Sequence, residues 1–112
     1  MILAMLAASA LLQPQDDPLP SPELARAGNA WSECLGTAVD SAPANLSPQD
    51  AAQAVLATCN PLQTEMMAAH GRWVDGLTVP EAQKRDARDA MRRSLVAVER
   101  QLAEAVRASR AD

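Results

Sequence analysis

The residues best equipped for chemistry in this sequence are two cysteines, Cys34 and Cys59, and one histidine, His70. The cysteines are too far apart for a redox Cys-x-x-Cys motif, and each falls on the apolar stripe of an expected helix. In an oxidising compartment two cysteines form one bond with no ambiguity of pairing. We therefore predict a structural disulfide between Cys34 and Cys59, which would stabilise a domain of this size by roughly 3 kcal/mol.

The stretch "MMAAH" places two thioethers and an imidazole at helical spacing. Met66 and His70 are four residues apart and Met67 and His70 are three apart, so all three fall on one side of a helix. Soft sulfur and imidazole ligands suit copper. The simpler interpretation is that the methionines continue the core stripe and that His70 complements the dipole at a helix C-terminus. A weak copper site is therefore the alternative hypothesis, and we predict no cofactor.

Groups for acid-base or nucleophilic catalysis are scarce in this chain. There is one histidine and no tyrosine, and cysteines joined in a disulfide are unavailable as nucleophiles. The sequence contains no Gly-rich phosphate loop, no Cys-x-x-Cys-His haem attachment and no zinc-type cluster. We predict that the protein is not an enzyme.

The basic residues gather near the C-terminus. Eight of the ten lie at Lys84 or later, and the densest group is Arg88, Arg92 and Arg93. The net charge is −4, acidic residues are interleaved with the arginines, and Phe and Tyr are absent, so we predict no nucleic-acid binding. The basic segment is expected to complement the more acidic half of the chain. If a surface meets an anionic protein partner, these three arginines are the candidates.

The N-terminus resembles an export signal. Residues 1–12 carry no charge, and Ala8-Ser9-Ala10 has the small-x-small pattern that signal peptidases accept, which predicts cleavage after Ala10. Twelve apolar residues are too few to span a bilayer, which requires about 20, so we expect no stable membrane insertion after cleavage. Abundant alanine and nine arginines against one lysine indicate a bacterial genome rich in G and C. We predict a periplasmic or secreted protein.

Three amphipathic segments are expected to position these residues, and no segment shows the alternation of a strand. The first begins at the N-cap Ser21, with Pro22 at the first helical position, and ends before Pro43. The second begins with the same device, Ser47 followed by Pro48. Its repetition strongly indicates two helix starts.

Proline and glycine interrupt the later part of the chain. Pro61 must kink or restart the second helix, because it removes a backbone hydrogen bond, and Asn60 is the candidate cap of the second half. The stretch from His70 to Gly76 predicts a turn. The third helix opens with a capping box from Thr78 to Glu81. Its narrow apolar seam, which would also suit a second copy of the chain, consists of Ala87, Met91, Leu95, Val98, Leu102, Ala105 and Ser109.

An antiparallel hairpin of the first two helices would bring the cysteines together. Their positions differ by about 7 Å along the hairpin, an offset that the connection from Ser41 to Ser47 can absorb. Trp31, on the first stripe, is the predicted largest core residue. Trp73, in the predicted turn, is expected to cover the open end of the bundle, with an exposed partner anchor as the alternative.

These observations predict a small all-α protein. The expected organisation is a signal peptide at residues 1–10, a disordered proline-rich linker at 11–20 and a three-helix bundle at 21–112, with its second helix kinked at Pro61. The expected function is a non-catalytic interaction or structural module in the periplasm. The alternative is the weak copper-binding protein described above.

Overall fold

The computed structural model describes residues 19–111, and every regular element in this part of the chain is an α-helix. The all-α prediction is confirmed, but the expected count of three helices is wrong, because four are present between residues 19 and 111. The predicted signal peptide and most of the linker lie outside the described residues. The helices are α2 (Pro22–Asp40), α3 (Pro48–Thr58), α4 (Asn60–Asp75) and α5 (Glu81–Ala111).

The first two helix starts form as the Ser-Pro pairs predict. The Ser21 hydroxyl accepts a hydrogen bond from the Leu24 N–H, and the Ser47 hydroxyl accepts one from the Asp50 N–H, each at 3.1 Å. Each bond satisfies one of the amide groups that a helix leaves unpaired at its N-terminus. The α5 helix begins at Glu81, two residues later than a cap at Thr78 predicts.

The fourth helix arises from a one-residue break at Cys59. This residue separates α3 from α4 with φ −96° and ψ 7°, while its N–H still donates to the carbonyl of Val55 and its carbonyl accepts from the N–H of Gln63. Pro61, two residues later, has no N–H for the preceding turn and its ring crowds the carbonyl of Ala57, which explains why the break occurs here. Cys59, not Asn60, occupies the N-cap position of α4, and it makes no side-chain capping bond.

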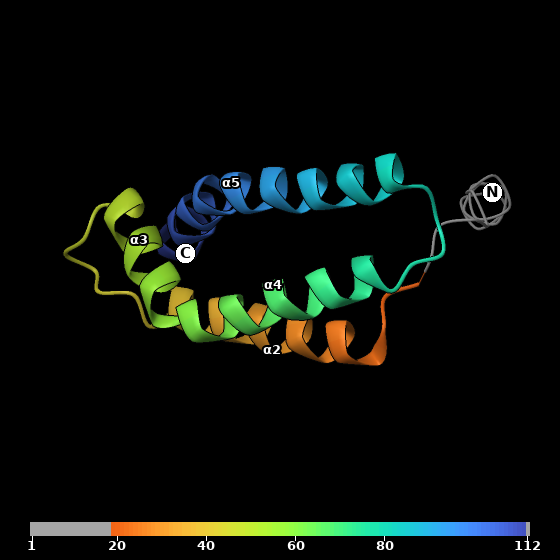
Figure 1. Cartoon of the computed structure of the whole chain (residues 1–112). Coiled ribbons are helices and arrows are strands. Elements are labelled where there is room, and N and C mark those ends of the chain that lie inside the picture. Colours follow the sequence, from red (N-terminus) through yellow and green to blue (C-terminus); the bar gives the residue numbers. More distant parts are fainter. Residues whose placement is uncertain (1–18, 112) are drawn as a thin grey trace, which may run out of the picture.

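The four helices form two pairs (Figure 1). The α4 helix runs antiparallel to α2 and packs mainly on it, whereas α3 crosses toward the C-terminal half of α5 and packs mainly on that helix. The two halves of the expected second helix thus have different principal neighbours. The predicted antiparallel hairpin exists, but it is formed by α2 with α4.

The main core lies where α3 meets α5. Ala52 and Val55 of α3 pack with Leu102 and Ala103 of α5. The α2 helix has no fully buried residue, and Trp31 is only partly buried, so its assignment as the largest core residue is wrong. The largest fully buried side chains between residues 19 and 111 are those of Val55, Val74, Val106 and Cys59.

The predicted turn from His70 to Gly76 is wrong, because α4 continues to Asp75 and only Gly76 ends it. An isolated glycine inside a helix costs only about 1 kcal/mol relative to alanine. In this segment His70 is 9% exposed and Val74 is fully buried, so burial offsets the cost of Gly71.

None of the helices within residues 19–111 combines the length and the apolar character needed to cross a bilayer. The longest, α5, has 31 residues and carries charged side chains along its whole length.

The disulfide between Cys34 and Cys59 is confirmed, with Cα atoms 5.8 Å apart. It joins the C-terminal half of α2 to the junction between α3 and α4. Cys59 is fully buried, so the bond lies inside the bundle. Because α2 buries no side chain completely, this bond is the strongest single constraint on its position.

We predict that the variant carrying both Cys34→Ala and Cys59→Ala loses about 3 kcal/mol of unfolding free energy, since the loop between the cysteines is no longer closed in the unfolded chain. Urea denaturation measures the loss. The rate of amide hydrogen exchange should increase most along α2. Reductant should destabilise the parent protein and leave the variant unchanged, and equal stability of parent and variant would contradict the prediction.

Candidate functional site

An apolar groove lies between α2 and α5, with a volume of about 480 Å³. This volume falls in the range of small-molecule sites, about 300–1,000 Å³. Met66 of α4, only 4% exposed, lies at its floor. No charged side chain is among the lining residues, which are Pro20, Leu24, Ala25, Gly28, Asn29, Trp31, Ser32, Met66, Met91, Ser94, Leu95 and Val98.

The polar side chains of the groove lie at its rim. Asn29 and Ser32 of α2 and Ser94 of α5 are all exposed, whereas the lining residues between them are mostly partly buried. The spacing of Met91, Leu95 and Val98 puts these side chains on one face of α5. The same face continues toward the C-terminus into Leu102, which packs in the core.

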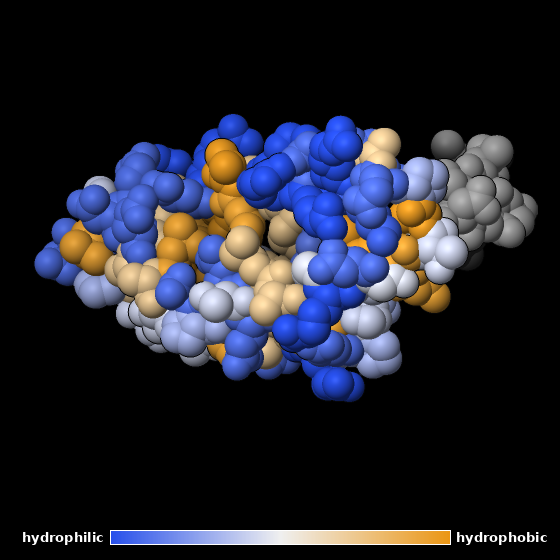
Figure 2. Space-filling view, viewed as in Figure 1, coloured by the Kyte–Doolittle hydropathy of each residue, from blue (hydrophilic) through white to orange (hydrophobic). Residues whose placement is uncertain are grey.

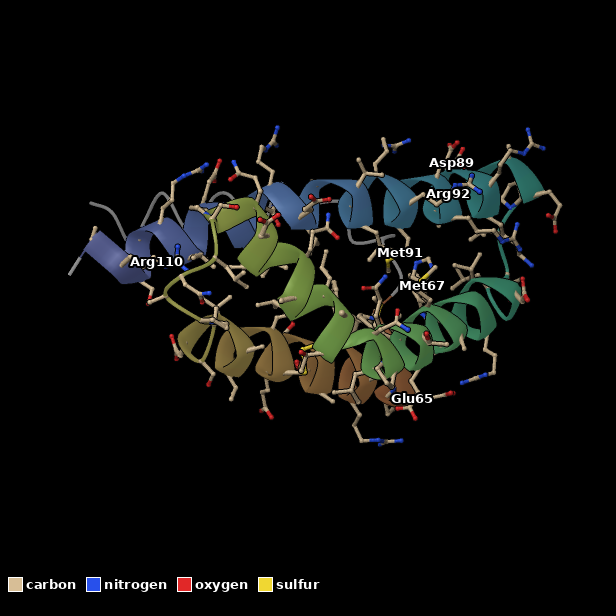
Figure 3. The ribbon with its side chains drawn as sticks, turned by 90° about the vertical axis from the view of Figure 1, so that its left-hand side faces the viewer. Glu65, Met67, Asp89, Met91, Arg92 and Arg110 are labelled. Atoms are coloured by element: carbon tan, nitrogen blue, oxygen red, sulfur yellow. A yellow bond between two sulfur atoms is a disulfide. The ribbon has the colours of Figure 1, made fainter. Side chains whose placement is uncertain are left out.

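Apolar surface is also visible on the face where α4 lies in front of α2. Figure 2 shows hydrophobic residues in a band between the hydrophilic upper edge, formed by α5, and the lower helices. In Figure 3, Met91 of α5 and Met67 of α4 both project into the space between these two helices, while Asp89 and Arg92 lie on the outer side of α5. Apolar side chains therefore lie between the two helices at this level, with Asp89 and Arg92 on the outer side.

The two tryptophans differ in the state of their indole N–H groups. Trp73, in the last turns of α4, donates a hydrogen bond of 2.9 Å from Nε1 to the carbonyl of Leu19, so it holds the start of the described chain against α4. Trp31 Nε1 is buried and has no hydrogen-bond partner among residues 19–111. Leaving a buried donor unpaired costs about 1–3 kcal/mol. Trp31 is one of the residues that line the groove, whereas its Nε1 atom is closed off from solvent.

His70 lies inside the bundle next to Trp73. It is 9% exposed, and the two rings are tilted by 50° with centroids 5.6 Å apart. Burial lowers the pKa of His70, because the charged imidazolium loses its hydration, and the positive charge of Arg88 lowers it further. The imidazole is therefore neutral at pH 7.

The three candidate copper ligands differ in their surroundings. Met66 and His70 are buried, whereas Met67 is 42% exposed. Met91, which the sequence analysis did not include in this group, lines the same groove as Met66. Within residues 19–111, no three His, Cys, Asp or Glu side chains form a cluster that could hold a metal ion. A site here would depend on the methionine sulfurs.

The candidate arginines of the partner surface take different directions. Arg88 bridges from α5 to the end of α4 through a 2.6 Å ion pair with Asp75, and Arg92 pairs with Asp89 of its own helix. Arg93 follows Arg92 by one residue and so lies about 100° further around α5. Their role as a surface for a partner stays a prediction.

Other basic groups hold the bundle together. Lys84 donates to the carbonyl of Asp75 at 3.1 Å, and Arg110 donates to the carbonyls of Pro43 and Leu46, both at 2.7 Å. On the opposite side Glu23 of α2 pairs with Arg72 of α4, and the hydrogen bond from Arg72 lowers the pKa of this carboxyl. Lys84 and Arg110 of α5 thus contact the end of α4 and the loop between α2 and α3 through backbone carbonyls.

The groove does not follow from the sequence pattern. Trp31 of α2 and Met91, Leu95 and Val98 of α5 were assigned to apolar stripes, but periodicity alone does not show whether two stripes close on each other. The small residues that precede Trp31 on α2 are the available signal, since Ala25 and Gly28 fill little of the space between α2 and α5.

The chain matches no known protein family, and neither a curated protein nor a solved structure shows significant similarity to it. Its function must therefore be argued from the groove, the disulfide and the groups around them.

We predict that His70 makes the stability of the fold depend on pH. Its pKa is lowered in the folded state relative to about 6.5 in the unfolded chain, so the unfolded chain binds more protons between these two values. The contribution of the neutral imidazole is complete above pH 6.5 and decreases as the pH falls through this window.

Urea denaturation from pH 8 to pH 5 tests this, with His70→Gln as the non-titrating control. The difference in unfolding free energy between parent and variant should fall as the pH falls. A difference that stays constant with pH would contradict the prediction.

Proposed function

We propose that this chain is an exported, non-catalytic binding module of an oxidising compartment such as the bacterial periplasm, and that it binds through the groove between α2 and α5. The groove is the observation that carries the proposal. A concave apolar surface with a few polar groups at its rim is the usual form of a small-molecule site.

The disulfide supports the proposed compartment. Such bonds persist in oxidising environments and are rare where thiols are kept reduced. The apolar start of the chain and Ala8-Ser9-Ala10 support export independently, because they supply a route to such a compartment. Both cysteines of the chain are consumed by the bond, which favours a binding role over thiol chemistry.

Gly28 offers a way to test the groove. A Cβ atom placed on Gly28 would meet no neighbouring atom within 4 Å, and the same is true of Gly36 on the same helix. Gly28 lines the groove, whereas Gly36 is exposed and does not. Replacing either glycine by leucine also favours the helix by about 1 kcal/mol, so neither variant is expected to unfold.

We predict that Gly28→Leu weakens binding of the uncharged fluorescent probe N-phenyl-1-naphthylamine by about tenfold, because the new side chain occupies the groove, while Gly36→Leu binds like the parent. Probe fluorescence gives Kd for the three proteins. Equal affinity in all three, or no binding to the parent, would contradict a binding role for the groove.

The oligomeric state must be measured in the same samples. If a second copy of the chain covered the groove, the mass in solution would rise with concentration, and it would fall to that of a monomer in Gly28→Leu. That outcome would replace the proposed ligand with self-association.

Copper binding is the second candidate, and the position of Met91 favours it. Met66 and His70 are one turn apart on α4, and Met91, which lines the same groove as Met66, would offer a third soft ligand. The neutral imidazole of His70 is available as a ligand. The positive charge of Arg88, close enough to lower the pKa of His70, opposes a cation at this place, so copper ranks second.

The copper candidate predicts one Cu(I) ion bound more tightly than micromolar, with loss of this binding in His70→Ala and Met66→Leu. Competition with a chromophoric Cu(I) chelator under anaerobic conditions measures the affinity. Glu65→Gln is the matched control, because Glu65 is on the same helix and exposed. Weaker binding by the parent, or equal binding by all variants, would exclude copper.

A further inference from the structure

We draw no further inference here: the strongest candidate, the apolar groove between α2 and α5, already carries the proposed binding role, and nothing in the structure shows what covers it.

Discussion

The bond between Cys34 and Cys59 is the constraint on which the rest of the structure depends. It attaches the C-terminal half of α2 to the junction between α3 and α4, where the chain changes direction. Cys59 is fully buried at this junction. The α2 helix contributes no fully buried side chain, so hydrophobic burial alone holds it weakly. A covalent link that restricts the unfolded chain compensates for this small core, as in other small domains.

The same break explains why a groove exists. Because α3 and α4 separate at Cys59, α3 packs against the C-terminal half of α5 and closes the bundle there, while α4 packs on α2. The N-terminal half of α5 is left facing α2 across small residues such as Ala25 and Gly28. Met66 reaches this space from α4 and Trp31 borders it from α2, so an apolar surface remains open. A single straight second helix would have no means of packing on both neighbours in this way.

The sequence predicted those features that local chemistry determines. The serine caps of α2 and α3, the interruption near Pro61 and the pairing of two cysteines follow from the residues themselves. The errors concern tertiary packing. Gly71 lies inside α4 because burial of Val74 outweighs its low helix propensity. Trp31 has the apolar periodicity of a core residue, but its burial depends on the distance between α2 and α5, which no local pattern specifies.

A binding partner would gain less free energy at the charged groups than at the groove. Arg88 and Arg92 already have carboxylate partners on the protein, and exposed ion pairs of this kind contribute about 0–1 kcal/mol. A partner that displaced them would gain little, since it would replace one well-hydrated contact with another. The groove offers apolar area that is in water. Because a ligand in the groove would remove this area from water, the physical argument for binding is stronger at the groove than at the arginines.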